Sequence, residues 1–344
     1  MGRDVGVRRG GGGGGGHALT GMRAPGAWTS AALTVLALAA CGDTPAEPVV
    51  DPGPQPVTSF DFLAGSWSVA SRDTDAGGGV TQGQATAVVR SSLTGRARKE
   101  AWVGTRNGAD VEMATLIIAG EQPGEWILAR GDGGAGTFDV LEGRFTSGQI
   151  TLVSRSGTRP DGGLNRETFE SITDSSFVRR AERSGDGGGS WTEFWKAEYR
   201  RIPSVGAPAG PTLAAGCQAS EHRQFDFWEG AWAVGGSTND LISLLGGCIL
   251  EENWSSASER GTSFNMYDAR SGLWNQVWVD TNDLTLVTVG GLVDTRMVLA
   301  GRYRGTSQRI TWTPLNGNVR QHGENSVNGG ASWTTSYDLT YTRR

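Results

Sequence analysis

The chain has 344 residues and a formal net charge of −5, from 31 basic and 36 acidic residues. This balance excludes a nucleic-acid binder that works through a basic surface. Only 37% of the residues are hydrophobic, and no apolar stretch approaches the roughly 18 residues of a membrane-spanning helix. Three cysteines and three histidines are too few for a zinc framework, so we expect no metal.

Residues 1–40 are typical of an export signal rather than of a folded domain. Gly10 to Gly16 is an unbroken glycine run that adds nothing to a signal, so Met22 is favoured as the true start. Arg23 then supplies the charged start of the signal, and Thr29 to Ala40 supply its short apolar segment. This segment is too short to remain in the mature protein as a membrane span.

Small residues lead directly into Cys41, and this ending resembles the signal box of bacterial lipoproteins. The resemblance implies that Cys41 receives a lipid, becomes the mature N-terminus and anchors the protein to a membrane of the cell envelope. Gly42 resembles the residue found in lipoproteins passed on to an outer membrane. The proline-rich residues 41–59 would form the lipidated linker. An ordinary secretory signal with a chance cysteine is the alternative.

An internal repeat organises the rest of the chain. The run Phe60 to Val69 returns as Phe225 to Val234, with six of the ten positions identical. Two further matches follow in the same order, and the last one pairs the segment ending at Arg201 with the one ending at Arg343. Each copy is long enough for its own core. The predicted domains are copy 1 at 60–201, a linker at 202–223 and copy 2 at 224–344.

Hydrophobic periodicity predicts β-structure in both copies. From Trp333 to Arg343, one set of side chains alternates with small polar ones, which is the period-2 pattern of a half-buried strand. Residues 125–129, 149–153 and 311–313 predict shorter strands, and Asn-Gly and Asp-Gly pairs between strands suit tight hairpin turns. Neither copy contains a long stretch of helical period. The pattern favours an antiparallel barrel or sandwich.

Each copy has Gly-x-Trp in its opening strand and an arginine at the close of its last strand, which resembles the calycin barrels. That group includes the lipocalins, the fatty-acid-binding proteins and the nitrobindin-like domains. The resemblance implies two tandem antiparallel calycin-like β-barrels, each with a tryptophan plugging one end and an arginine packed over it. The matching residues are Gly65, Trp67 and Arg201 in copy 1, and Gly230, Trp232 and Arg343 in copy 2.

The opening run Phe225 to Trp232 of copy 2 also resembles an uncharacterised family of secreted bacterial domains, which copy 2 matches over nearly its whole length. This resemblance implies a barrel with one apolar cavity and implies no reaction.

Cys217 and Cys248 are the two cysteines left after lipidation. Outside the cytoplasm an even pair usually forms a disulfide, which here would tie the strand preceding Phe225 to the first hairpin of copy 2. Closing a loop of about 30 residues stabilises a fold by about 3 kcal/mol in the chain-entropy model. Two buried free thiols are the alternative.

Two glutamates occupy equivalent positions, since Glu100 and Glu252 lie two residues before Trp102 and Trp254. On a strand, each glutamate and its tryptophan share one face. If that face is internal, the carboxylate has a raised pKa and can act as an acid, a base or a ligand anchor. An outward glutamate at a strand end is the alternative.

Further candidates for a ligand site in copy 2 are Trp254, Trp278, Trp312, Arg320 and His322. Tryptophans suit the wall of a cavity, although they also suit plain core packing. The nitrobindin resemblance makes His322 the haem-ligand candidate of copy 2, with a solvent-facing strand as the alternative.

Other cofactor and nucleophile motifs fail. Gly131 to Gly136 match G-x-G-x-x-G, but a strand rather than a helix is expected to follow, which rejects a nucleotide site. The chain has no G-x-S-x-G elbow, and its few histidines leave little room for a serine triad.

Three functional hypotheses follow. The favoured one is a membrane-anchored lipoprotein whose second barrel binds a small apolar or amphipathic ligand. An alternative is a barrel-type enzyme in which Glu252 and Arg320 act on a bound substrate. The third is a structural envelope protein with filled barrels. We expect no cofactor and no nucleic-acid partner in any of them.

Overall fold

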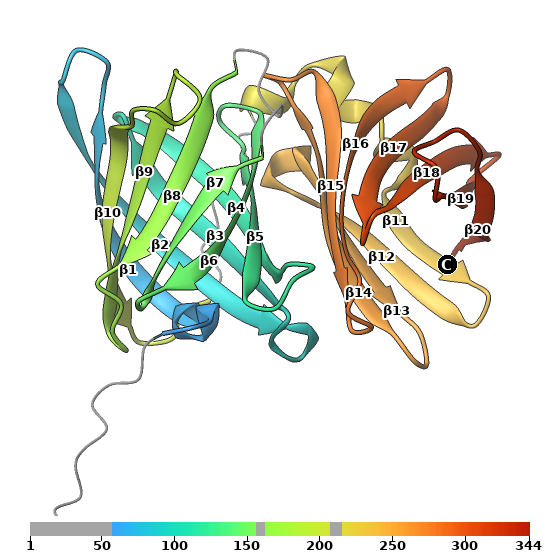
Figure 1. Ribbon diagram of the computed structural model, residues 1–344, viewed down its shortest axis with the longest axis horizontal. Coiled ribbons are helices and arrows are strands. Elements are labelled where there is room, and N and C mark those ends of the chain that lie inside the picture. The colour runs from blue at the N-terminus through green and yellow to red at the C-terminus, as the bar shows by residue number, and fades with distance from the viewer. Residues whose placement is uncertain (1–56, 156–161, 207–214) are drawn as a thin grey trace, which may run out of the picture. The chain divides into compact units, whose positions relative to one another are not determined.

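The computed structural model of the protein describes residues 57–155, 162–206 and 215–344. These residues form two closed antiparallel barrels of ten strands each, one after the other along the chain (Figure 1). Within each barrel every strand pairs with its sequence neighbours, and the first strand pairs with the last. The predicted class, all-β with two tandem antiparallel barrels, is confirmed. The expected signal and Cys41 lie outside the described residues.

The first barrel consists of β1 (Gly65–Thr74), β2 (Val80–Ser92), β3 (Ala97–Arg106), β4 (Ala109–Ala119), β5 (Glu125–Asp132), β6 (Thr137–Thr146), β7 (Gln149–Ser154), β8 (Leu164–Glu170), β9 (Ser176–Ser184) and β10 (Thr192–Ile202). The second barrel consists of β11 (Gly230–Val234), β12 (Ser237–Leu244), β13 (Ile249–Ser255), β14 (Arg260–Asp268), β15 (Leu273–Asp280), β16 (Thr285–Val293), β17 (Arg296–Tyr303), β18 (Thr306–Leu315), β19 (Asn318–Ser326) and β20 (Thr334–Arg343). Short 3-10 helices lie between them: η1 (Phe60–Leu63), η2 (Leu93–Gly95), η3 (Ala215–Cys217), η4 (Ser220–Arg223), η5 (Asp226–Trp228) and η6 (Leu245–Gly247). No helix in the described part of the chain has both the length and the apolar character that a membrane span requires.

In the first barrel, an arginine of the last strand packs against a tryptophan of the first strand and joins the two. Trp67 lies opposite Arg201 in the register of β1 and β10, and the guanidinium carbon lies 4.2 Å from the centre of the indole ring. Arg201 also donates hydrogen bonds of 2.8 Å to the backbone oxygens of Phe62 and Ala64. The indole N–H of Trp67 donates to the backbone oxygen of Leu63. The arginine therefore ties η1, β1 and β10 together at one end of the barrel.

The second barrel repeats this arrangement. The guanidinium carbon of Arg343 lies 4.2 Å from the centre of the Trp232 ring, and Arg343 donates to the backbone oxygen of Glu229. Gly230 adopts a φ of +130°, and a Cβ at this position would overlap the guanidinium of Arg343. The equivalent glycine of β1 has a φ of +136° and meets the first barrel's arginine in the same way. Both signatures expected from the sequence are therefore present.

The two barrels differ at the seam between their first and last strands. In the first barrel β1 pairs with β10 over eight residues, from Ser66 to Asp73. In the second barrel β11 has only five residues and pairs with β20 at Trp232 and Ala233 alone. The part of β20 that precedes Tyr341 therefore has no ladder partner on the side of β11.

The alternation predicted over residues 333–343 holds only for part of β20. The register between β19 and β20 shifts between Gly323 and Glu324, which marks a β-bulge. After the bulge, the side chains of Tyr337, Leu339 and Tyr341 all face the barrel interior. Before the bulge, the side chain of Trp333 packs instead under Arg309, on the outer face. The single extra residue of the bulge therefore places the side chains that precede it on the opposite face from the one that simple alternation predicts.

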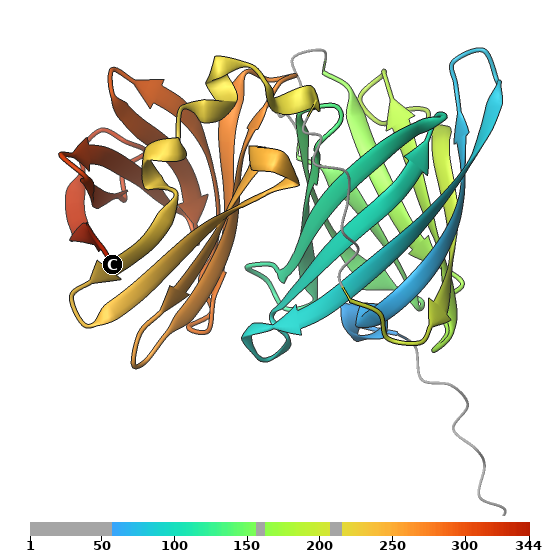
Figure 2. The ribbon, with the colours of Figure 1, turned by 180° about the vertical axis from the view of Figure 1, so that it is seen from behind.

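A disulfide joins Cys217 and Cys248, with their Cα atoms 5.4 Å apart. The pairing agrees with the expectation from the sequence, but the segment before Phe225 is not a strand. It folds as η3 and η4, which are drawn in yellow in Figure 2. The disulfide therefore ties η3 to the residue that follows η6, at the start of the β13 strand.

We predict that Gly230→Ala lowers the free energy of unfolding by about 1–3 kcal/mol, because alanine is strained at this φ and its Cβ meets Arg343. Gly291→Ala on β16 is the matched control, since a Cβ there meets open space, and surface changes of this kind stay within about 0.5 kcal/mol. Urea unfolding of the two variants measures the difference. Equal stabilities would show that the arginine and tryptophan do not constrain the barrel end.

Candidate binding site

The two glutamates at equivalent positions of the repeat, Glu100 and Glu252, point into their barrels. Glu100 pairs with Thr115 of the next strand, and Glu252 pairs with Ser263, so the two occupy the same place in their barrels. The residues are only 6% and 3% exposed. The alternative of an outward glutamate therefore does not hold for either copy.

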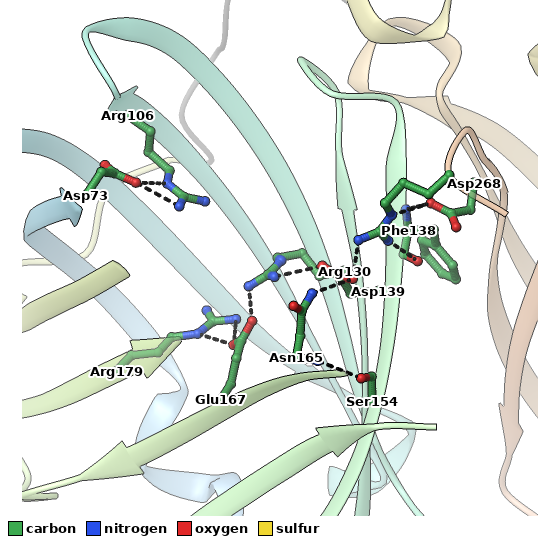
Figure 3. A network of polar contacts seen from close by, with 11 residues as sticks. Asp73, Arg106, Arg130, Phe138, Asp139, Ser154, Asn165, Glu167, Arg179 and Asp268 are labelled. Atoms are coloured by element: carbon green, nitrogen blue, oxygen red, sulfur yellow. Dashed lines mark hydrogen bonds and ion pairs between the residues drawn. The ribbon is translucent and has the colours of Figure 1, made fainter. Parts of the chain in front are cut away.

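In the first barrel, Glu100 belongs to a chain of ion pairs, and Figure 3 shows the part of this chain formed by Arg130, Asp139, Glu167 and Arg179. Arg179 of β9 lies 3.1 Å from a carboxylate oxygen of Glu100 and 2.7 Å from one of Glu167 on β8. Glu167 also pairs with Arg130 of β5, whose second nitrogen lies 3.0 Å from Asp139 on β6. Two arginines therefore alternate with three carboxylates across the interior.

A third arginine completes the charge balance of this network. Arg270, which follows β14, lies 2.8 Å from Asp139. Burial opposes ionisation of Glu167, but Arg130 and Arg179 outweigh it and hold the pKa of this carboxyl below its ordinary value. Every carboxylate of the network lies within ion-pair distance of an arginine, and the side chains of the network occupy the centre of the first barrel. Among the described residues, the carboxylates of this network therefore all have arginine partners already.

The second barrel keeps the glutamate and lacks its counter-charges. Thr115 pairs with Arg130 in the first barrel, whereas the equivalent Ser263 pairs with Trp278 in the second. Following the registers of the other strands in the same way gives the remaining equivalences. The network residues Arg130, Arg179, Glu167 and Asp139 correspond to Trp278, Gln321, Ile310 and Leu286.

Glu252 is therefore a buried carboxyl group without an arginine or lysine beside it. Its two oxygens accept hydrogen bonds of 2.7 Å from the amide of Asn239 and 2.8 Å from the hydroxyl of Ser263. Burial raises the pKa of Glu252 to about 7, and these two hydrogen bonds offset only part of the effect. The group changes charge near neutral pH.

A cavity of about 210 Å³ opens beside Glu252 in the second barrel. The wall is mostly apolar or aromatic, with glutamines from three strands and two further carboxyl groups. It is formed by Glu252, Trp254, Glu259, Gln276, Trp278, Asp280, Leu284, Leu286, Gln308, Ile310, Gln321, Tyr337, Leu339 and Tyr341. Tyr337 and Leu339 come from the part of β20 that lacks a partner along the seam, and both are partly exposed. The incomplete seam therefore coincides with one wall of the cavity.

Three of the six ligand-binding residues predicted in copy 2 line this cavity, namely Glu252, Trp254 and Trp278. Trp312 does not line it, because its ring is fully buried and packs 5.2 Å from the rings of Phe225 and Trp228. This tryptophan belongs to the core at the plugged end of the barrel.

Arg320 and His322 lie on the outer face of β19, because strand alternation places their neighbour Gln321 inside. Arg320 forms an ion pair with Asp338, and the His322 ring is 3.0 Å from the Thr335 hydroxyl. The expectation that these two residues share a site with Glu252 is therefore wrong. Neither an Arg320–Glu252 catalytic pair nor a haem ligated by His322 inside this barrel fits the geometry.

Several cavity residues were missed by reasoning from the sequence. The three glutamines carry no motif, and Tyr337 and Tyr341 were assigned to a strand face but not to a site. The signal that could have found them is the repeat itself: Gln321 replaces Arg179, and such a loss of charge at an internal position marks a changed interior. Within the described residues, no group of three or more histidine, cysteine or acidic side chains is arranged to hold a metal ion.

No family model matches the chain, and no curated protein sequence matches it. Among solved structures, the chain is similar to the S-type phycobiliprotein lyase CPES from Guillardia theta, with a TM-score of 0.33 and 12% identity over 42% of this chain and 92% of that one. It is also similar to Rv2717c from M. tuberculosis, with a TM-score of 0.32 and 11% identity over 41% of this chain and 94% of that one. A protein of unknown function from the DUF3598 family of Nostoc punctiforme gives a TM-score of 0.25 and 11% identity, over 82% and 97% of the two chains. Similarity at this level carries no argument about the site.

We predict that Glu252→Gln stabilises the protein at alkaline pH and leaves it unchanged in mild acid. The folded-state pKa of about 7 lies above the ordinary 4.5, so the neutral form favours folding. That stability is complete below the ordinary pKa and is lost as the pH rises through about 7, by up to about 3 kcal/mol. Denaturant unfolding of both proteins from about pH 5 to 8.5 measures the difference.

Glutamine can keep the contacts to Asn239 and Ser263, so the substitution changes mainly the charge. The control is Glu198→Gln, at an exposed ion pair with Arg200, where less than about 1 kcal/mol is at stake. A difference between wild type and Glu252→Gln that does not vary with pH would contradict the raised pKa.

Proposed function

We propose that the protein is a lipid-anchored protein of the bacterial cell envelope whose second barrel binds a small apolar or amphipathic ligand. The observation that carries this proposal is the contrast between the two interiors. The same internal position holds a glutamate in both barrels, but only the second surrounds it with an apolar cavity instead of ion pairs. Concave, mainly apolar sites with a few polar groups are the usual form of small-molecule sites.

The first barrel is the structural partner in this proposal. Its centre is occupied by the network of Glu100, Arg130, Asp139, Glu167 and Arg179, all of it internally paired. The structural alternative, with both barrels filled, is disfavoured by the cavity of the second. The enzymatic alternative loses the arginine that it required, because Arg320 is on the outside.

The anchor rests on the sequence alone. Small residues before Cys41, the apolar segment of the signal and the proline-rich residues that follow support lipidation of that cysteine. A lipid chain would hold the barrels near a membrane surface and not within it. The exported location agrees with the disulfide between Cys217 and Cys248, since such bonds persist mainly outside the cytoplasm.

We predict that protein purified from envelopes by mild detergent carries a ligand in the second barrel, and that Leu286→Trp loses it. The larger ring fills the cavity beside Glu252. Native mass spectrometry detects the ligand as extra mass that leaves on denaturation. Leu292→Trp is the control, because Leu292 lies on the same strand but is 40% exposed. A wild-type protein without extra mass, or equal retention by Leu286→Trp, would count against the proposal.

We predict that Cys41→Ser abolishes incorporation of radioactive palmitate and releases the protein from the membrane fraction, because the side chain that receives the lipid is gone. The double variant Cys217→Ser with Cys248→Ser should keep the label, since those two cysteines form the disulfide. Labelling that survives Cys41→Ser would remove the lipoprotein assignment.

A further inference from the structure

The charges that line the cavity of the second barrel are of one sign. Glu252, Glu259 and Asp280 contribute carboxyl groups, and no lysine, arginine or histidine contributes to the wall. In the first barrel the equivalent interior contains two arginines of its own. The second interior thus has the equivalent glutamate without the arginines that accompany it in the first.

The three carboxyl groups are not equally available. Asp280 accepts hydrogen bonds from the backbone N–H groups of Asn282 and Leu284, and the indole N–H of Trp278 lies 3.3 Å from its other oxygen. Burial and the neighbouring Asp280 raise the pKa of Glu259, so this carboxyl shares its surroundings with a second acidic group. Glu252 has only the neutral donors Asn239 and Ser263. Among the described residues, none of the three forms an ion pair with an arginine or lysine, and Glu252 is deeply buried in the barrel, at 3% exposed, with only these two hydrogen bonds to its carboxylate.

Aromatic rings form much of the remaining wall. Trp254, Trp278, Tyr337 and Tyr341 all line the cavity that contains Glu252. The faces of aromatic rings attract cations, tryptophan most strongly, and this attraction grows when water is excluded. The indole nitrogen of Trp254 is buried and has no partner among the described residues. Such a wall suits an apolar or aromatic body joined to a positively charged head.

We propose that the ligand of the second barrel is a small organic amine, bound as the ammonium ion with its head at Glu252 and its body against Trp254 and Trp278. This inference rests on the proposed ligand-binding function and names its ligand class. The cavity of about 210 Å³ corresponds to on the order of seven water volumes, which suits a body of one ring or a short chain. An ammonium ion supplies the charge that Arg179 supplies to Glu100 in the first barrel.

The test uses three probes with one body and three heads: 2-phenylethylamine, 2-phenylethanol and phenylacetate, each titrated into the full-length protein by calorimetry near pH 8. The amine should bind at least about tenfold more tightly than the alcohol, since an ion pair with a desolvated carboxylate is worth more than a neutral contact. Phenylacetate should not bind detectably, because its charge repels Glu252.

Amine binding should also weaken as the pH falls. An aliphatic amine stays protonated over this range, so the change comes from the protein. Glu252 titrates near pH 7, and only its ionised form pairs with the cation, which predicts about thirty-fold weaker binding at pH 5.5 than at pH 8. Glu252 contacts Asn239 and Ser263 directly, and Tyr337 and Tyr341 lie close to it. The carboxyl groups of Glu259 and Asp280 belong to the wall of the same cavity. Protonation of Glu259, whose pKa burial also raises, acts in the same direction, and the Glu252→Gln variant separates its part.

Glu252→Gln should bring the amine down to the affinity of the alcohol and remove most of the pH dependence. Glu100→Gln, the same change at the equivalent position of the filled barrel, should leave amine binding unaltered. The comparison of the three probes on the wild-type protein does not depend on the folding of either variant.

The outcomes separate the two proposals. Binding of the alcohol or phenylacetate as tightly as the amine, or a native ligand that carries no basic nitrogen, overturns the amine assignment and leaves the carrier function standing. Failure of all three probes to bind, together with native protein free of extra mass, overturns both. Equal effects of Glu100→Gln and Glu252→Gln would remove Glu252 as the site of the head group.

Discussion

The stacking of an arginine on a tryptophan at the strand seam is the constraint on which both barrels depend. A closed sheet needs its last strand to meet its first in one register, and here Arg201 with Trp67, and Arg343 with Trp232, define that register. Each arginine also bonds the backbone just before the first strand, so it fixes the entering chain and the closing chain together. Glycine is required beside the guanidinium because any side chain would occupy its place. The rest of each interior is built on a wall closed in this way.

Duplication placed one carboxylate in two electrostatic surroundings. In the first barrel Glu100 meets Arg179, and buried charges that are fully paired and hydrogen-bonded can be accommodated at modest net cost. In the second barrel Gln321 stands in for that arginine, and Glu252 carries the desolvation penalty alone, which is why its pKa moves towards neutrality. A space in the fold and an unbalanced charge at its edge arise from the same substitutions. The two barrels thus share one fold, but the centre of the first is filled by ion pairs and the centre of the second contains a cavity.

The internal repeat and the period-2 pattern predicted two antiparallel β-domains, because both signals are local in the sequence. The choice of a barrel and its seam residues came from the resemblance to the calycins, and the disulfide came from the even pair of cysteines. The sequence predicted that Glu252 and Trp254 share a face, since they lie two apart on a strand, and Trp278 was a candidate because tryptophans suit the wall of a cavity; all three line the cavity. It failed for Arg320 and His322 because alternation alone does not say which face is internal. It failed for Trp333 because a bulge, which leaves no mark in the hydrophobic pattern, reverses the face of β20. The ion network was also missed: its members come from five strands, and only the closed topology brings them together.

The short seam has a mechanical consequence for the second barrel. Most barrels resist widening because a ladder of backbone hydrogen bonds runs along every strand, and none can part without breaking many bonds. Here β11 holds β20 at two register positions, whereas β1 holds β10 at eight. The first half of β20 is bonded along its length to β19 but not to β11, so the edge that faces β11 can part from that strand without breaking a ladder. The wall of the second barrel is therefore closed by backbone hydrogen bonds everywhere except along this one line, where separation of the strands would cost side-chain contacts instead.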